Sequence, residues 1–266
     1  MINLSETLYK QSEEILLKEL DLLDFEPTKE SIAIKSFSES FGSSGRLDSE
    51  YYLPMYDEVL NKIENYKGGF KKLEYFSENY STGYPFKSDS YVKNGTYLIR
   101  INNIKKGYLD ISNASKIPND DIELSQKDIA KENDILISMS GTIGNSCKIP
   151  KGIEAVINQR IMRITPKNIG FELLPLLINS VIGQNQLERI GTGGVQTNIS
   201  SSDILSILIP IIDINIQTQI EDKIKESFKL KEESKRLLEV AKRAVELAIE
   251  EGEDMGMGFI KDEVDL

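Results

Sequence analysis

Residues 216–251 read IQTQIEDKIKESFKLKEESKRLLEVAKRAVELAIEE, a stretch with neither glycine nor proline. Glutamate, lysine, leucine, isoleucine and alanine dominate it, and these residues have high helix propensity. Apolar side chains recur in it at spacings of three and four, at Ile220, Ile224, Phe228, Leu238, Ala241, Val245 and Ala248. The periodicity predicts one long helix that carries a coiled-coil seam.

A helix with such a seam leaves apolar surface in water when it stands alone, so it needs a partner. The sequence leaves two partners open, a second copy of the chain and the N-terminal segment. Residues 4–24 have apolar side chains at a similar spacing, and Pro27 ends the segment, which predicts a short amphipathic arm. We expect the subunit interface to be formed by the seam residues Ile220, Ile224, Phe228, Leu238, Ala241 and Val245.

The middle of the chain has a different texture. Short segments rich in tyrosine, isoleucine and threonine alternate with glycine, asparagine and serine turns as far as about residue 170. Strands are predicted within residues 95–101, 134–139, 153–157 and 160–164, and helices within residues 53–64 and 171–189. The predicted fold class is therefore α+β, a mixed α/β domain with long coiled-coil-forming helices at the two ends.

Composition shifts divide the chain into four predicted parts. Residues 40–45 read SFGSSG, which is typical of a linker, and the segment after Gly252 is acidic. The predicted parts are an N-terminal helical arm and linker (1–45), a globular domain (46–212), a long C-terminal coiled-coil helix (213–252) and an acidic flexible tail (253–266).

Missing residue types exclude much chemistry. The chain has no histidine and a single cysteine, Cys147, so it lacks the ligands of a zinc site built on His and Cys and the base of Ser-His-Asp or Cys-His sites. The glycines at 191–194 lack the lysine and helix of a phosphate-binding loop. We expect no catalytic residue, no metal and no cofactor in this chain.

The same composition bears on localisation. A lone cysteine excludes an intrachain disulfide, which fits the reducing cytoplasm. The N-terminus lacks the pattern of a secretory signal, and no apolar run reaches the roughly 18 residues that cross a bilayer. The expected protein is cytoplasmic and has no membrane partner.

Net charge is −11, which by itself argues against a nucleic-acid partner. The acidic residues, however, concentrate at both ends of the chain, while residues 57–107 carry nine basic and six acidic side chains. We therefore expect the chain alone to bind DNA weakly and to need a partner that supplies further phosphate contacts.

Four local strings, in this order, resemble the specificity subunit of type I restriction-modification enzymes. They are RLDSEYY (46–52), YLIRINNI (97–104) with Gly107, NDILIS (133–138) with SGTIG (140–144) and INQR (157–160), and GGVQTNI (193–199) leading through ILIP (207–210) to Gln217 and Ile220. The resemblance covers roughly residues 46–250. It departs from the family in one respect, because a full subunit has two target recognition domains and two helical regions, whereas one recognition domain flanked by helices is found here.

The resemblance implies a half-length specificity subunit without catalysis of its own. Its target recognition domain would lie in the major groove of double-stranded DNA, and its helices would hold DNA-adenine methyltransferase subunits, and in some complexes a restriction or translocase subunit. S-adenosylmethionine would be bound by the methyltransferase. A homodimer through the long helices would place two recognition domains on symmetric half-sites, so the target would be an interrupted inverted repeat.

Base edges in the major groove are read by Arg, Lys, Asn, Gln, Ser and Thr. Loops that carry these types give the candidate DNA-binding residues, which are Lys87, Ser88, Arg100, Asn102, Asn103, Lys105, Lys106, Ser138, Ser140, Thr142, Gln159, Arg160, Gln196, Thr197 and Asn198. Structural interpretations compete for several of them. Lys105 and Lys106 can form a solvated turn, Arg100 can form a structural ion pair, and Gly141 and Gly144 can simply permit a tight turn.

Two other functions remain open at this point. The first is the recognition end of a fused restriction-methyltransferase, which the absence of an [N/D]-P-P-[Y/F] segment disfavours. The second is a coiled-coil adaptor or anti-restriction decoy that binds methyltransferase subunits without reading DNA, which the acidic net charge favours. Replacing Arg100 and Gln196 would discriminate a DNA reader from a decoy, because the change abolishes sequence preference only in a DNA reader.

Overall fold

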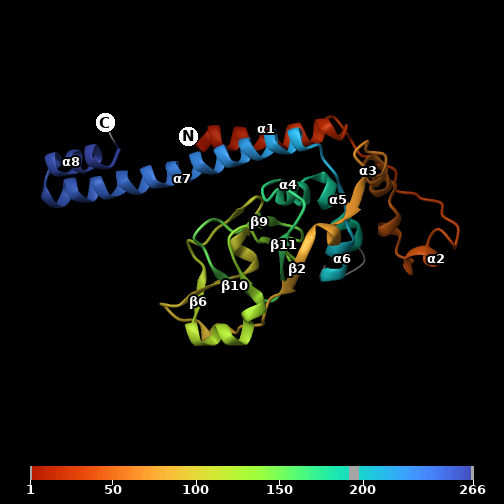
Figure 1. Ribbon diagram of the computed structural model, residues 1–266, viewed down its shortest axis with the longest axis horizontal. Helices are drawn as coiled ribbons and strands as arrows, with labels where there is room; N and C mark the ends of the chain where they lie inside the picture. Colours follow the sequence, from red (N-terminus) through yellow and green to blue (C-terminus); the bar gives the residue numbers. More distant parts are fainter. Residues whose placement is uncertain (1, 192–197, 265–266) are drawn as a thin grey trace. The chain divides into compact units, whose positions relative to one another are not determined.

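The computed structural model describes residues 2–191 and 198–264 (Figure 1). The chain forms two compact units. One unit, here called the helical unit, combines the residues up to Leu16 with the residues from Thr218 onward. The other, here called the globular unit, spans Leu17–Gln217.

In the helical unit, helix α1 (Ile2–Glu19) runs antiparallel to helix α7 (Ile214–Glu251). The Ser5 hydroxyl donates to the Ser227 carbonyl at 2.8 Å, and the Ser227 hydroxyl donates to the Ser5 carbonyl at 2.7 Å. The rings of Tyr9 and Phe228 lie 6.2 Å apart. Ile220 and Ile224 are buried here, so the N-terminal arm is the partner of the first half of the predicted seam.

The second half of the seam is exposed within the helical unit. Leu238, Val245 and Ile249 are 54%, 59% and 80% exposed. They lie on the same line of α7 as Ile220 and Ile224, because the 3-4 spacing continues across Lys231 and Ser234. We call Leu238, Ala241, Val245 and Ile249 the exposed stripe of α7.

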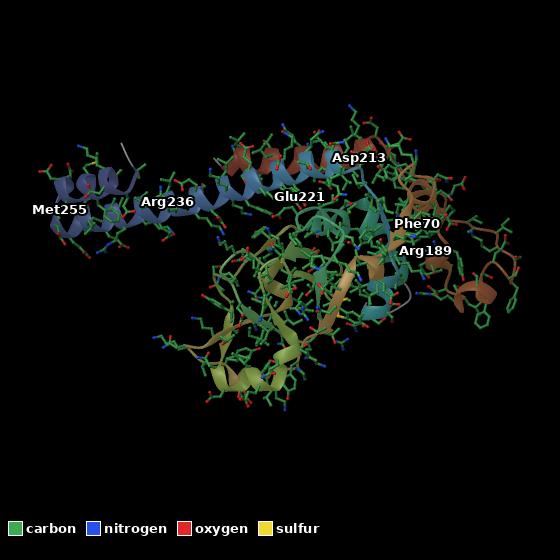
Figure 2. The ribbon with its side chains drawn as sticks, viewed as in Figure 1. Phe70, Arg189, Asp213, Glu221, Arg236 and Met255 are labelled. Atoms are coloured by element: carbon green, nitrogen blue, oxygen red, sulfur yellow. The ribbon has the colours of Figure 1, made fainter. Side chains whose placement is uncertain are left out.

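A further helix, α8 (Glu253–Val264), folds back along α7 (Figure 1). Figure 2 labels Arg236 and Met255 on this hairpin, and Arg236 Nη1 donates to the Glu263 carbonyl at 3.0 Å. A Cβ atom at Gly256 would lie 2.6 Å from the Ala244 carbonyl oxygen, so only glycine allows this close approach. Val240 and Ala244 are buried on this face of α7, which leaves the exposed stripe uncovered.

Helix α8 corrects the expectation of a loose acidic tail from residue 253 onward. Glu253 and Asp254 lie in its first turn, where carboxylates stabilise a helix through the macrodipole. Acidic composition suggested disorder, whereas the close packing of Gly256 on α7 is a tertiary contact that composition does not reveal.

The described residues of the globular unit form twelve strands and the shorter helices. The strands are β1 (Phe70–Lys72), β2 (Ser77–Thr82), β3 (Thr96–Ile99), β4 (Ile104–Lys105), β5 (Tyr108–Leu109), β6 (Ser115–Ile117), β7 (Ile129–Ala130), β8 (Ile135–Ser138), β9 (Ser146–Lys148), β10 (Ala155–Ile157), β11 (Ile161–Pro166) and β12 (Leu208–Pro210). The α-helices are α2 (Phe41–Ser44), α3 (Pro54–Glu64), α4 (Leu173–Asn179), α5 (Val181–Gly191) and α6 (Ser201–Ser206). The 3₁₀ helices are η1 (Ser49–Tyr52), η2 (Leu73–Phe76), η3 (Ser88–Ser90), η4 (Ile101–Asn103) and η5 (Asn119–Asp128).

Two four-stranded sheets form the centre of this unit. The first has the order β2-β11-β8-β9 and is antiparallel throughout. The second has the order β6-β3-β10-β7, in which β3 and β10 are parallel and the outer pairs are antiparallel. Strands β4 and β5 form a hairpin, and β1 pairs with β12. The unit is therefore a mixed α/β domain, and together with the long terminal helices it confirms the predicted fold class.

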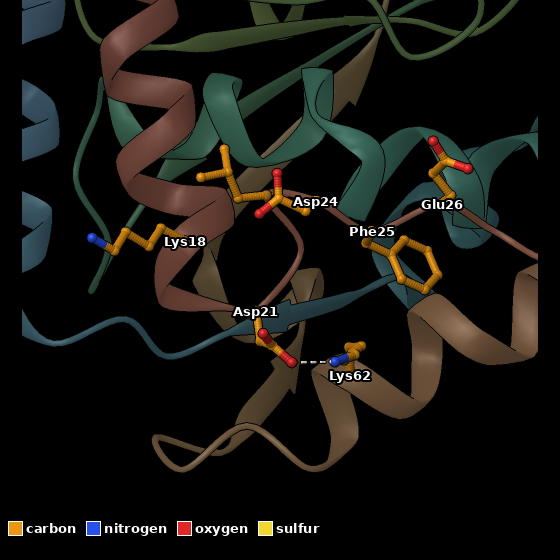
Figure 3. Close-up of a pocket in the computed structure, with 7 residues that line it drawn as sticks. Lys18, Asp21, Asp24, Phe25, Glu26 and Lys62 are labelled. Atoms are coloured by element: carbon orange, nitrogen blue, oxygen red, sulfur yellow. Dashed lines mark hydrogen bonds and ion pairs between the residues drawn. The ribbon is translucent and has the colours of Figure 1, made fainter.

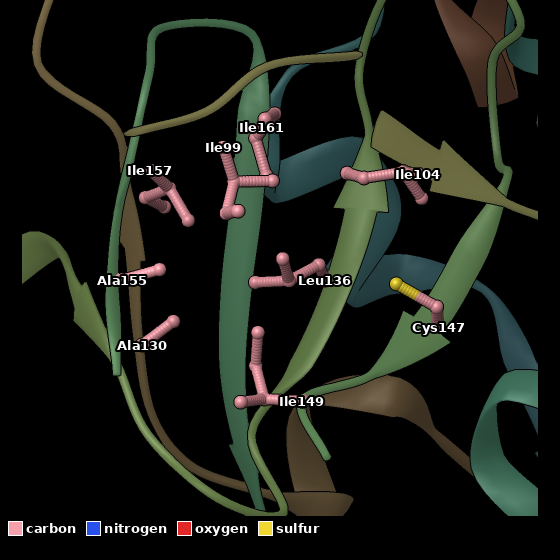
Figure 4. Packing of buried hydrophobic residues seen from close by; sticks show 9 residues of the cluster. All are labelled: Ile99, Ile104, Ala130, Leu136, Cys147, Ile149, Ala155, Ile157 and Ile161. Carbon is pink, nitrogen blue, oxygen red and sulfur yellow. The ribbon is translucent and has the colours of Figure 1, made fainter. Parts of the chain in front are cut away.

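A buried apolar cluster joins the two sheets (Figure 4). Its members are Ile99, Ile104, Ala130, Leu136, Cys147, Ile149, Ala155, Ile157 and Ile161. Strands β3 and β10 contribute from one sheet, and β8, β9 and β11 contribute from the other, so this core fixes the loops that leave the strand ends. Burial raises the pKa of the Cys147 thiol, which makes it a packing residue.

Within residues 2–191 and 198–264, no helix combines the length and the apolarity that crossing a bilayer requires.

Candidate nucleic-acid interface

Three loops of the globular unit meet at the ends of strands from both sheets. The Asn158 N–H donates to the Ile99 carbonyl at 2.9 Å, which ties the loop after β10 to the loop after β3. The Met139 N–H donates to the Arg160 carbonyl at 2.9 Å, which ties the loop after β8 to the same place. Backbone hydrogen bonds therefore hold residues 99–103, 139–145 and 158–160 side by side.

An open hollow of about 510 Å³ lies among these loops. It is lined by Arg100, Ile101, Asn102, Thr142, Asn158, Gln159 and Arg160. Five of these residues, Arg100, Asn102, Thr142, Gln159 and Arg160, are candidates from the sequence, and they come from three separate segments. None of the seven described lining residues is acidic, so the hollow presents two guanidinium groups beside neutral donors and acceptors.

Arg100 is held at this hollow without a carboxylate partner among the described residues. Its Nε is buried and has no hydrogen-bond acceptor in the described part of the chain. Its guanidinium carbon lies 5.6 Å from the centre of the Tyr91 ring. A guanidinium in this position suits an external acceptor such as a phosphate or a base edge, and the structural ion pair that the sequence also allowed is not formed within the described residues.

Two candidate residues instead support the loops. Asn103 is 2% exposed, accepts the Arg100 N–H at 2.9 Å and donates to the Asp110 carbonyl at 2.9 Å. Ser138 is fully buried, and its hydroxyl donates to the Thr142 and Asn145 carbonyls. The loop backbone thus already uses the polar atoms of Asn103 and Ser138, and their contact with DNA stays a prediction.

The glycines of the 140–144 loop have the structural role that the sequence allowed. Gly141 and Gly144 have φ values of +70° and +77°, which side chains rarely adopt. At Gly144 a Cβ atom would also lie 2.6 Å from the Gln184 side chain, so the turn packs closely on α5. The two glycines shape the loop that brings Thr142 to the hollow.

The remaining candidates that the structure describes are not among the residues that line this hollow. Lys87 and Ser88 lie at η3, and Lys105 and Lys106 lie at the β4–β5 hairpin. Ser140 forms a bridge with Asn198, while Gln196 and Thr197 lie outside the described residues. The sequence candidates missed one polar lining residue, Asn158, whose Oδ1 accepts the Gln159 N–H at 2.8 Å. Its place in the INQR string beside Gln159 was the available signal.

Two other hollows of the globular unit have an unsuitable charge for nucleic acid. One of about 440 Å³ is lined by Asp21, Asp24 and Glu26 together with Lys18 and Lys62, and Figure 3 shows Asp21 directed toward Lys62. Asp21 and Lys62 form an ion pair there. A neighbouring hollow of about 590 Å³ shares that pair and adds Glu19 and Glu58. Carboxylates repel phosphates, so the hollow at Arg100 and Arg160 is the candidate nucleic-acid interface.

Elsewhere in the globular unit, Arg163 of β11 forms a buried polar network. Arg163 is 9% exposed and lies 3.4 Å from the Asp134 carboxylate. Its guanidinium also donates to Thr165 at 2.9 Å and to Asn79 at 3.0 Å. These contacts tie β2, β8 and β11 together, and the pairing of Arg163 with Leu136 puts the network on the same face of the sheet as the apolar cluster.

A second buried carboxylate, Asp128, lies at the end of η5 beside this network. Desolvation by burial raises its pKa, although a hydrogen bond from Ser81 and the charges of Lys127 and Arg163 oppose the shift. One of its oxygens has no hydrogen-bond partner in the described part of the chain. The folded state therefore favours the protonated form, and ionised Asp128 reduces the free energy of unfolding at neutral pH.

We expect Asp128→Asn to raise the thermal unfolding midpoint at pH 7, because the amide carries no charge to desolvate. The gain shrinks as the pH falls through the raised pKa, where wild-type Asp128 becomes protonated. Thermal unfolding of both proteins between pH 4 and 7 measures this difference. A gain that grew with acidification would contradict the assignment.

Residues 60–242 match the family model of the type I restriction modification DNA specificity domain. The chain belongs to this family. Every residue that lines the candidate interface falls within the matched range.

Two curated relatives are specificity subunits from Escherichia coli. The chain is 26% identical over 140 residues to the type I restriction enzyme EcoBI specificity subunit, which covers 52% of the chain and 29% of the relative. It is 27% identical over 172 residues to the EcoAI specificity subunit, which covers 62% of the chain and 29% of the relative. The matched segments thus span less than a third of the length of these two relatives.

Solved structures of the family also resemble the chain. The HsdS subunit from Thermoanaerobacter tengcongensis aligns with a TM-score of 0.43 and 14% identity, over 80% of the chain and 51% of that structure. The type I restriction-modification S subunit from M. genitalium aligns with a TM-score of 0.48 and 11% identity, over 90% of the chain and 53% of that structure.

Proposed function

We propose that the chain reads a DNA sequence as a specificity subunit and performs no catalysis itself. One observation carries the proposal. Five candidate base-reading residues from three distant segments converge on one open hollow without a described carboxylate, in a chain of the DNA specificity domain family.

The chemistry of the hollow suits the major groove. Arg100 and Arg160 offer the forked donors that guanine and phosphate accept, and Asn102 and Gln159 offer the paired donor and acceptor that adenine matches. Since the whole chain carries a net charge of −11, these contacts alone give weak binding, and a partner has to supply more phosphate contacts.

The proposed partner is a DNA-adenine methyltransferase, which the specificity chain positions on the target. S-adenosylmethionine is then bound by that partner. A restriction subunit can join the same complex. The relatives are specificity subunits of type I restriction enzymes, which supports this assignment.

A second copy of the chain is the proposed partner of the exposed stripe of α7. The stripe continues the line on which α1 already covers Ile220 and Ile224, so it extends an existing helix-pairing surface. Pairing of two α7 helices about a two-fold axis presents two reading hollows to two half-sites. The target is then an interrupted inverted repeat.

Purification of the tagged chain from its native host tests the proposal. We expect a methyltransferase to co-purify, together with DNA enriched in one interrupted motif. Recovery of the methyltransferase with no enriched motif would favour a decoy. Recovery of neither would overturn the assignment.

Arg100→Ala is expected to weaken binding of the enriched motif by about 10- to 100-fold, because a guanidinium contact to a base or phosphate is lost. Titration of a fluorescent duplex by anisotropy measures the change. Lys151→Ala is the matched control, since Lys151 is an exposed cation of the globular unit that does not line the hollow. Equal losses in the two variants would contradict a reading role for Arg100.

A further inference from the structure

Arg160 has an unusual backbone conformation for its residue type. Its φ is +69°, in the left-handed region where arginine is strained and glycine is not. Gln159, the neighbouring residue, is exposed, and so is Arg160. Glycine at an exposed position of this kind would remove the backbone strain without any loss of packing. The presence of arginine therefore indicates that its side chain has a role.

The backbone around Arg160 is fixed by three loops. The Asn158 N–H donates to the Ile99 carbonyl, the Gln159 N–H donates to the Tyr84 carbonyl at 3.1 Å, and the Met139 N–H donates to the Arg160 carbonyl. The next residue, Ile161, is fully buried in the apolar cluster. The backbone at Arg160 is therefore rigid, and it sets the direction in which the side chain leaves the loop.

Its side chain is free for an external partner. No ion pair or side-chain hydrogen bond of Arg160 is formed with residues 2–191 or 198–264. Arg100 differs, because its Nε is buried and its guanidinium lies over Tyr91. Of the two arginines at the hollow, Arg160 is the one with the exposed, extendable fork.

Resting on the proposed function, we propose that Arg160 determines specificity by binding the O6 and N7 atoms of one guanine in the major groove. A guanidinium whose direction is set presents both of its donors to O6 and N7 in a fixed geometry, whereas a phosphate contact tolerates a flexible lysine. The described lining of the hollow contains no lysine, and its other polar members are of the base-reading types. The rigid backbone and the retained strain both favour base reading over a phosphate contact.

The test compares motifs selected from a randomised duplex library by the co-purified complex containing wild-type chain, Arg160→Gly or Arg160→Lys. The wild-type motif is expected to contain a guanine at one position, and both variants are expected to lose the preference for guanine at that position. Affinity for the wild-type motif falls by about 10- to 100-fold in Arg160→Gly, while affinity for unrelated DNA changes little. Arg160→Gly is also expected to unfold at no lower temperature than wild type, since glycine accepts the positive φ.

Three results would overturn the proposal. A motif unchanged in both variants excludes a reading role for Arg160. A uniform loss on all sequences, with a salt dependence reduced by about one unit of slope, assigns Arg160 to a phosphate. Retention of the guanine preference by Arg160→Lys shows that a positive charge is enough for the preference and that the forked guanidinium is not required. If the wild-type complex selects no motif at all, the proposed function fails as well, which separates the two failures.

Discussion

Arg163→Met is expected to destabilise the globular unit by about 3–5 kcal/mol, because it leaves the buried Asp134 carboxylate without its cation. Arg163 is 9% exposed and Asp134 is 5% exposed, so water does not replace the lost partner. The guanidinium contacts to Asn79 and Thr165, which join β2 to β11, are lost in the same change. Such a loss is a large part of the stability of a typical domain.

Urea unfolding followed by tyrosine fluorescence measures the effect in the relevant unit. The chain has no tryptophan, and every tyrosine except Tyr9 lies within Leu17–Gln217. Lys131→Met is the matched control, because Lys131 and Glu154 form an exposed pair at 4.0 Å. The control should cost less than about 1 kcal/mol. Similar losses in the two variants would show that the buried network contributes no more than a surface pair.

A double variant makes the test sharper. Asp134→Asn combined with Arg163→Met removes the unpaired charge, so its cost should fall short of the sum of the two single costs. Additive costs would mean that the two side chains act independently. The 3.4 Å separation of Nη1 from the carboxylate is consistent with coupling.

Periodicity predicted the regular elements well. The long helix predicted for residues 216–251 is found at Ile214–Glu251, since no glycine or proline competes with its helix-forming residues. Each of the four predicted strand segments contains a strand, namely β3, β8, β10 and β11. Their apolar and β-branched residues fit buried sheet positions, which local sequence expresses directly.

Tertiary contacts decided the features that the sequence did not reveal. The helix expected within residues 171–189 divides at Ser180, whose hydroxyl donates to the Leu177 carbonyl and accepts the Ile182 N–H. The sequence alone does not distinguish a serine at the boundary between two helices from a serine within one helix. The sequence likewise did not predict helix α8, because its close contact at Gly256 is made with α7.

Residue types predicted which loops form the candidate interface, but they did not predict which side chains of those loops are buried. Arg100, Asn102, Thr142, Gln159 and Arg160 share one hollow, as loops rich in base-reading types suggested. Asn103 and Ser138 are of the same types, yet their side chains turn inward to loop carbonyls. Which loop side chain points inward is set by turn geometry, and turn geometry follows from long-range contacts between the loops.

Leu238→Glu combined with Val245→Glu is expected to convert a dimer of the chain into monomers. The two side chains are 54% and 59% exposed in the helical unit, so their replacement costs little in the folding of one copy. Glutamate is a good helix former, and α7 should remain helical. In a paired seam, however, each carboxylate would be buried without a partner, which disfavours association strongly.

Light scattering coupled to size-exclusion chromatography measures the mass, which should fall from twice that of the chain to that of one chain. Arg243→Glu is the control, because Arg243 is exposed on another face of α7 and the substitution introduces the same carboxylate. The control should remain dimeric. A wild-type protein that is monomeric at micromolar concentration would contradict the pairing of α7 helices.

The same double variant separates dimerisation from base reading. In the proposed dimer, two hollows would bind two half-sites of one duplex. The second contact would then be intramolecular, so affinity for an interrupted repeat would exceed that for a single half-site. The monomeric variant should lose this excess and bind both duplexes alike. Because neither substituted residue lies in the globular unit, its preference for one half-site sequence should be unchanged. Loss of that preference would instead indicate that pairing of α7 shapes the reading hollow itself.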